Sequence, residues 1–133
     1  MKLSIVIPAF NECGKIGYDV ESGCEFLQRN GFEGEIIVAD DGSRDATADE
    51  AKKAGEKYRN RVNVKVIRNQ RHNGKGYAVR SGIMQATGDY VMFADSGSCV
   101  PLDNALRGLE LLKTGKYDIA HGSRLLAVTH LIK

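Results

Sequence analysis

The fold is decided by the stretch LSIVIPAFNE, residues 3–12, in which a mostly apolar run leads directly into a proline and then an acidic side chain. Two further runs share this plan: Glu35–Ala39 leads into Asp40-Asp41-Gly42-Ser43, and Tyr90–Ala94 leads into Asp95-Ser96-Gly97. Short apolar runs bounded by turn residues are typical of buried parallel strands. If the three strands lie side by side, their carboxylates gather along one edge of the sheet, where open α/β folds bind ligands.

The rest of the chain alternates between helical and strand patterns. Helices are predicted from Glu12 to Asn30, from Asp45 to about Gly55, from about Lys75 to Ala86, and from Pro101 to the stop at Gly115. Two more strands are predicted, Val62–Ile67 and Tyr117–Ala120. This order predicts an α/β fold, with a single open, mostly parallel twisted sheet and helices on both faces.

The composition excludes several classes of protein. The 133 residues suit one domain, and 19 basic against 17 acidic residues, with no basic block, do not indicate a nucleic-acid or anionic-membrane partner. No apolar stretch approaches the roughly 18 residues that span a bilayer, and the first run is too short for a signal peptide. The three cysteines, Cys13, Cys24 and Cys99, lack the spacing of a disulfide framework or a zinc site. We therefore expect a cytoplasmic chain with reduced thiols and no membrane span.

Three features of the strand ends could carry chemistry. Pro8-Ala9-Phe10 can lay an aromatic ring beside a ligand, and Glu12 can accept hydrogen bonds near a helix N-terminus; the alternative is an ordinary strand exit. Asp40 and Asp41 are two adjacent acids at the end of the second run. The alternative is a simple capping turn, but such a turn needs only one acid.

A glycine-bearing loop precedes the third helix. In Arg71-His72-Asn73-Gly74-Lys75-Gly76, backbone N–H groups and Lys75 could face phosphate, or the loop could be a plain connection. It matches neither a Walker A loop nor the dinucleotide fingerprint. His72, His121 and His130 lack metal-ligand spacing and are interpreted as structural or solvated.

Five motifs together resemble family 2 inverting glycosyltransferases, most closely the branch of dolichyl-phosphate mannose synthase and the polyprenyl-phosphate glycosyltransferases. They are IVIPAFNE (residues 5–12), EIIVADDGSRDAT (35–47), NGKGYAVRSGI (73–83), ATGDYVMFADSG (86–97) and DIAHGSR (118–124). The resemblance covers residues 3 to 124 and implies a nucleotide-diphospho-sugar site on a GT-A fold, which is Rossmann-like.

The resemblance also implies roles for individual residues. Pro8, Phe10 and Glu12, with the intervening Ala9, would hold the base and ribose. Ala39 and Asp41 would contact the base, and Asp40 would support the turn. Asp95, Ser96 and Gly97 occupy the D-x-D triplet, in which Asp95 would bind Mg²⁺ or Mn²⁺. Arg124 would face the donor sugar or its diphosphate, so that Asp95 and Arg124 are the predicted catalytic residues.

Gly97 departs from the family pattern, because relatives usually carry a second aspartate that binds the metal at this position. Losing a direct ligand should weaken metal binding by at least about 10–100-fold. Asp95 together with substrate phosphates could nevertheless suffice to hold the metal. The resemblance further implies that relatives continue past Gly-Ser-Arg into an acceptor-binding half. We therefore expect a donor-binding domain at 1–124, a short tail at 125–133, and a missing acceptor half whose unfinished face could support a homo-oligomer.

The resemblance implies one function and leaves an alternative open. The first is transfer of a hexosyl group from a GDP- or UDP-sugar, with inversion, to an acceptor such as a polyprenyl phosphate or a glycan. The alternative, favoured by Gly97 and the missing half, is a catalytically weak or inactive nucleotide-sugar-binding module. A dinucleotide-dependent oxidoreductase is disfavoured, because the first strand lacks the glycine fingerprint.

Overall fold

The computed structural model describes residues 1–96, 102–122 and 131–132 of the chain, which divides into two compact units, Met1–Cys99 and Val100–Lys133. The first unit contains β1 (Lys2–Ala9), α1 (Ile16–Arg29), β2 (Glu33–Asp40), α2 (Thr47–Glu56), β3 (Asn63–Arg68), α3 (Lys75–Gln85) and β4 (Tyr90–Phe93). The predicted elements of this unit are all present, and their ends differ from the prediction by a few residues.

The first unit is built on a four-stranded sheet in the order β3-β2-β1-β4, with every neighbouring pair parallel. Ala9 at the end of β1 is in register with Asp40 at the end of β2, which in turn pairs with Arg68 at the end of β3. The carboxyl ends of these strands therefore lie along one edge. The prediction of an open parallel sheet is confirmed.

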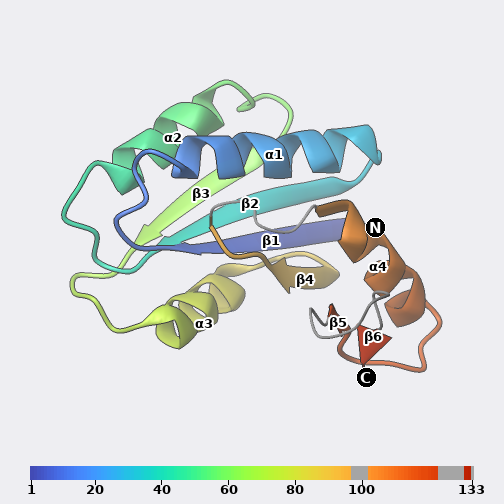
Figure 1. Cartoon of the computed structure of the whole chain (residues 1–133). Coiled ribbons are helices and arrows are strands. Elements are labelled where there is room, and N and C mark those ends of the chain that lie inside the picture. The colour runs from blue at the N-terminus through green and yellow to red at the C-terminus, as the bar shows by residue number, and fades with distance from the viewer. Residues whose placement is uncertain (97–101, 123–130, 133) are drawn as a thin grey trace. The chain divides into compact units, whose positions relative to one another are not determined.

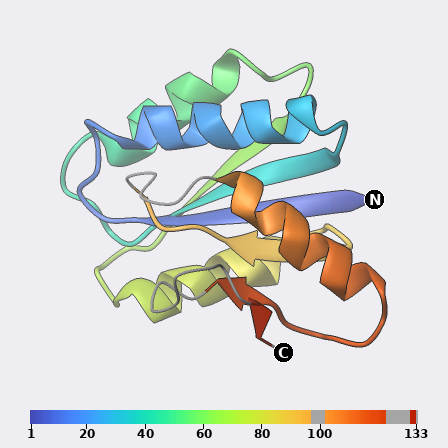
Figure 2. The same ribbon diagram turned by 45° about the vertical axis from the view of Figure 1, so that its right-hand side comes forward.

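Helices cover both faces of this sheet (Figure 1). α1 and α2 pack against each other and against β2 on one face, whereas α3 packs on β1 and β2 from the other face. Figure 2 shows the same three layers from a second direction. The change of face occurs between β3 and β4, where the chain crosses back over β2 and β1 to pair β4 with β1.

The core lies on the central strands. Leu3, Ile5 and Val6 of β1 are fully buried, as parallel strands covered on both faces require. α3 approaches β1 closely, because a Cβ added at Gly82 would lie 2.3 Å from a methyl group of Val6. Each fully buried aliphatic side chain contributes about 1.5–3 kcal/mol, so β1 anchors the domain.

A buried carboxylate joins the sheet to the turn before β4. Glu35 is 1% exposed, and its Oε2 accepts hydrogen bonds from Ser4 Oγ (2.6 Å), Thr87 N (2.7 Å) and Thr87 Oγ1 (2.9 Å). Its Oε1 lies 3.0 Å from Lys65 Nζ on β3. Burial alone would raise the pKa of Glu35, but these donors outweigh burial and lower the pKa to about 2. The carboxylate thus holds three strands and one turn together.

The second unit contains a 3₁₀ turn (Leu102–Asn104), α4 (Ala105–Lys113), and β5 (His121–Gly122), which pairs antiparallel with β6 (Leu131–Ile132). The predicted strand Tyr117–Ala120 is wrong, because these residues are irregular. A charged residue, Asp118, interrupts the run, and Ile119 is 68% exposed, so the segment buries too little apolar surface for a strand of a parallel sheet.

Two predictions fall outside the described part of the chain. The first-turn role of Pro101 is one, and the domain boundary at residue 124 is the other. Among the described residues, no helix is long and apolar enough to cross a bilayer.

Candidate functional site

The candidate site lies where the strand order reverses. β1 has β2 on one side and β4 on the other, and ligands of open α/β sheets bind at the carboxyl ends of the strands beside such a reversal. A cavity of about 260 Å³ is found there. It is lined by eight of the predicted site residues and two others: Pro8, Ala9, Phe10, Glu12, Asp41, Lys75, Asp95 and Ser96, with His72 and Ala78. The structure therefore brings Glu12, Asp41 and Asp95 to one cleft.

The loop after β1 is held in place by the loop after β2. Asn11 adopts a positive φ of 51°, a conformation in which asparagine is enriched. Its backbone N–H donates to Ser43 Oγ at 2.8 Å, and its side-chain Oδ1 accepts from Arg44 N at 3.0 Å. Glu12 N donates to Thr47 Oγ1 at 2.9 Å. These bonds fix the backbone on either side of the cleft residues Phe10 and Glu12.

Asp41 accepts three hydrogen bonds from the loop between β3 and α3, and a histidine of the same loop lies close to its carboxylate. Its Oδ1 accepts from Asn69 Nδ2 (3.2 Å) and Asn73 N (3.0 Å). Its Oδ2 accepts from Gly74 N (2.7 Å) and lies 2.8 Å from His72 Nδ1. Burial would raise the pKa of Asp41, but the two backbone donors, the Asn69 amide and the nearby His72 together lower it. Asp41 is thus an ionised carboxylate that secures this loop.

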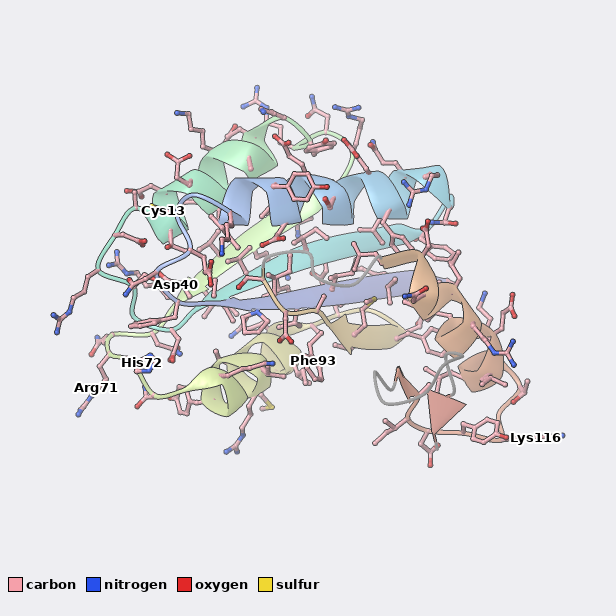
Figure 3. All side chains as sticks on the ribbon, viewed as in Figure 1. Cys13, Asp40, Arg71, His72, Phe93 and Lys116 are labelled. Atoms are coloured by element: carbon pink, nitrogen blue, oxygen red, sulfur yellow. The ribbon has the colours of Figure 1, made fainter. Side chains whose placement is uncertain are left out.

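Ala39 and Asp40 are not part of the cavity lining. Both are buried at the end of β2, and Figure 3 shows Asp40 beside the strand ends. Asp40 Oδ1 accepts from Ser43 N at 3.1 Å, and its Oδ2 lies 3.7 Å from Arg68 Nε. The two neighbouring acids therefore differ, since one faces the turn and the other lines the cleft.

A positive charge enters the cleft from the start of α3. Lys75 is the first residue of this helix, and Gly74 before it has a φ of 102°, which favours glycine. Lys75 Nζ contacts Asp95 Oδ1 directly and lies 5.9 Å from the centre of the Phe93 ring. A lysine at a helix N-terminus, where backbone N–H groups also point outward, is suited to bind a phosphate group.

A divalent metal would find few ligands in the part of the chain that the structure describes. The described residues include no group of three or more histidine, cysteine, aspartate or glutamate residues that could bind a metal ion. Asp95 provides a carboxylate in the cleft, and that carboxylate contacts Lys75. Gly97 and Arg124 lie outside the described residues.

Sequence reasoning missed His72, which lines the cleft with its ring centre 3.9 Å from that of Phe10. Figure 3 shows His72 and its neighbour Arg71 on the loop that enters α3. The available signal was its place in the glycine-bearing loop, two residues before Gly74. Ala78, also missed, lines the cleft from α3 and carries no reactive group.

Comparison with known proteins supports the assignment of fold and family. The model of glycosyl transferase family 2 matches residues 4–129. The dolichyl-phosphate beta-glucosyltransferase of Saccharomyces cerevisiae is 35% identical over 92% of this chain and 40% of its own length. The dolichol-phosphate mannosyltransferase of Pyrococcus furiosus is 36% identical over 93% of this chain and 33% of its own.

A solved structure shows the same similarity. Glucosyl-3-phosphoglycerate synthase from Mycobacterium tuberculosis, in complex with Mn²⁺, UDP and glucosyl-3-phosphoglycerate, is 30% identical, with a TM-score of 0.57 over 71% of this chain and 33% of its own. The chain spans 40% of the length of the first two curated relatives it matches. The resemblance found in the motifs is confirmed, and the chain belongs to glycosyl transferase family 2.

Proposed function

We propose that this chain binds the donor in an inverting glycosyltransferase, which transfers a hexosyl group from a GDP- or UDP-sugar to a polyprenyl phosphate. One observation carries the proposal: a single cleft is lined by an aromatic ring and a carboxylate, Phe10 and Glu12, and by Lys75 at a helix N-terminus. Aromatic and acidic groups suit a base and a ribose, whereas the lysine suits a diphosphate. The named activities of the relatives, dolichyl-phosphate glucosyltransfer and mannosyltransfer, agree with this chemistry.

The reaction would proceed by in-line displacement at the anomeric carbon. An acceptor oxygen forms a bond to this carbon while the bond to the diphosphate oxygen breaks, and the leaving diphosphate keeps the electron pair. Lys75 stabilises the charge that develops on the leaving group, and Arg124 is proposed to do the same. A phosphate acceptor is already anionic and needs no general base, whereas a sugar hydroxyl would need one.

A divalent cation fits this cleft if it arrives with the donor. Mg²⁺ is often held by one or two carboxylates together with substrate phosphates, and Asp95 supplies one carboxylate. The M. tuberculosis relative was solved with Mn²⁺ and UDP. When bound, the cation would neutralise part of the diphosphate charge. Lys75 would first have to leave Asp95, so we propose that cation binding is weak without nucleotide.

Titration calorimetry with UDP and GDP, each with and without Mn²⁺, tests the proposal. One of the two nucleotides should bind, and the variant Lys75→Met should bind it at least about tenfold more weakly, because a charge-assisted contact to phosphate is lost. The neutral surface variant Gln70→Ala, outside the cavity lining, is the control. Absence of binding by both nucleotides under all conditions would refute the donor site.

A binding module without turnover is the second candidate. The contact between Lys75 and Asp95 favours it, because the cleft carboxylate that is expected to take the metal is already paired with a cation. Restoring the family pattern with Gly97→Asp separates the candidates in a donor-hydrolysis assay. Recovered turnover would identify a weakened transferase, and continued inactivity of a variant that binds UDP or GDP would identify the module.

We also propose that the chain works in the cytoplasm, at membranes that hold its lipid acceptor. Cys13 and Cys24, the two cysteines in the described part of the chain, are free thiols, which is usual for cytoplasmic proteins. The relatives' dolichyl-phosphate names support a lipid-linked acceptor. Transfer from the preferred nucleotide sugar to dolichyl phosphate in vesicles tests this part of the proposal.

A further inference from the structure

Lys75 holds its ammonium group at the carboxylate that is expected to receive a divalent cation. Lys75 Nζ contacts Asp95 Oδ1, and both residues line the cleft. The two side chains are 57% and 60% exposed, so the pair by itself contributes little to stability. The pair matters because it fixes a positive charge at the oxygen that a metal ion would otherwise occupy.

The sheet register explains why these two side chains meet. Phe93 on β4 is in register with Val6 on β1, and Val6 packs against α3 at Gly82. Register partners in a parallel sheet share a face, so Phe93 faces α3. Lys75 Nζ, at the start of α3, lies 5.9 Å from the centre of the Phe93 ring. Asp95 follows Phe93 by two residues, which brings its carboxylate to the same side.

The backbone before Lys75 is held by hydrogen bonds. Gly74 N donates to Asp41 Oδ2 at 2.7 Å, and Asn73 N donates to Asp41 Oδ1 at 3.0 Å. Gly74 O accepts from Ala78 N at 3.1 Å, which begins the hydrogen bonding of α3. The loop therefore delivers Lys75 to the cleft from a fixed point of the chain.

An ammonium group at this position can bridge a carboxylate and a diphosphate, as a divalent cation does. Lysine has three N–H donors, so the contact with Asp95 leaves two donors for phosphate oxygens. A cation bound by one carboxylate likewise completes its coordination with substrate phosphates. Both arrangements place positive charge against the diphosphate, but the lysine is part of the chain and does not have to be recruited from solution.

The ligands offered to a metal are poor by comparison. In the part of the chain that the structure describes, no three histidine, cysteine, aspartate or glutamate side chains gather as a metal site would need. The resemblance led us to expect a second metal-binding aspartate at position 97, where this chain has glycine and so no side-chain oxygen. A metal ion would also have to displace the ammonium group of Lys75 from Asp95.

We propose that Lys75 takes the place of the divalent cation in holding the donor diphosphate, so that this chain binds its nucleotide almost as tightly without a metal as with one. The inference rests on the proposed donor site and adds that an ammonium group bridges Asp95 and the diphosphate. A cation can still arrive with the donor, but it then replaces Lys75 at Asp95 and adds little affinity.

Calorimetry with UDP and GDP, in Mn²⁺ and in a chelator, tests the inference. The two affinities of the parent for the preferred nucleotide should agree within about threefold, because the ammonium group already neutralises the phosphates. Lys75→Met keeps a long side chain without the charge, and it should lose at least about tenfold in the chelator. Mn²⁺ should recover most of that loss. Lys52→Met, on the exposed side of α2 and outside the cavity lining, removes the same charge and should behave like the parent.

Nuclear magnetic resonance tests the contact itself. The ¹³Cε signal of Lys75, assigned by its absence from Lys75→Met, should move when UDP or GDP is added in the chelator. Lys75→Arg keeps the charge, so it should bind the nucleotide more tightly than Lys75→Met under the same conditions.

Three results would overturn this inference while leaving a donor site intact. The first is a parent whose loss of affinity in the chelator exceeds the threefold margin. The second is a Lys75→Met variant that loses less than the expected tenfold there. The third is a ¹³Cε signal that the nucleotide does not move. By contrast, a parent that binds neither UDP nor GDP under either condition would refute the donor site itself, and the inference with it.

Discussion

The buried carboxylate of Glu35 should make the stability of the domain depend on pH in a defined range. The pKa of this group falls from the usual 4.5 to about 2 in the folded chain, since its donors outweigh burial. A carboxyl group with a lower pKa in the folded state stabilises the protein above its unfolded pKa, and this stabilisation is lost as the pH falls toward the folded pKa. The sensitive range is therefore between about pH 4.5 and 2.

The size of the effect follows from this change in pKa. A shift of this size corresponds to about 3 kcal/mol of stability at neutral pH, of which roughly 2 kcal/mol is lost between pH 7 and pH 3. Glu35→Gln removes the titration but keeps the shape of the side chain. We expect the difference in unfolding free energy between the parent and this variant to be about 3 kcal/mol at pH 7 and about 1 kcal/mol at pH 3.

Urea unfolding of both proteins at several pH values measures this difference, and the effects of other carboxylates cancel in it. A direct titration of the Glu35 carboxyl carbon by nuclear magnetic resonance gives the same information for the parent alone, should the variant not fold. A difference in unfolding free energy that stays constant from pH 7 to pH 3, or a titration midpoint above 4, would refute the reasoning.

Three further predictions concern single side chains. Gly42→Ala should destabilise the domain by about 2 kcal/mol or more in urea unfolding, since it adds a Cβ at positive φ against the backbone of the next loop, whereas Gly14→Ala, in open space, should be nearly neutral. Lys75→Met frees Asp95 for a cation, so Mn²⁺ should strengthen UDP binding by a larger factor in this variant than in the parent. Calorimetry with Mn²⁺ and with a chelator measures this factor, and equal factors within twofold would contradict the prediction. Burial raises the pKa of Cys24 to about 12, so a thiol reagent should modify it only on unfolding, which mass spectrometry of labelled peptides would show.

Much of the first unit could be predicted from the sequence because its central strands obey one simple requirement. A parallel strand covered on both faces must be apolar almost throughout, and Leu3–Ile7 and Glu35–Ala39 meet that requirement. The place of the acidic residues followed from it, because parallel strands end at one edge. Tyr117–Ala120 was predicted as a strand from a similar pattern, but Ile119 in this segment is exposed. Burial depends on which elements pack against a segment, and the local sequence does not specify them.

The aromatic pair in the cleft could not be predicted, for a different reason. The contact between His72 and Phe10 joins residues that are far apart in the chain, and it exists because Asp41 and Gly42 hold the intervening loop. Spacing rules identify metal ligands and phosphate loops, but they say little about a ring that another element holds in place. The partners of Asp41 could not be predicted either, since the loop donors that meet its carboxylate are brought to it only by the fold.

The order of the strands also affects how donor preference could pass between proteins. The described residues proposed to meet the base, ribose and diphosphate all precede residue 97, within one compact unit. A chimaera that joins this unit to the later half of a relative should therefore keep the nucleotide choice of its first parent. Acceptor choice would then be inherited separately, so recombination near residue 99 could yield new donor–acceptor combinations in one step.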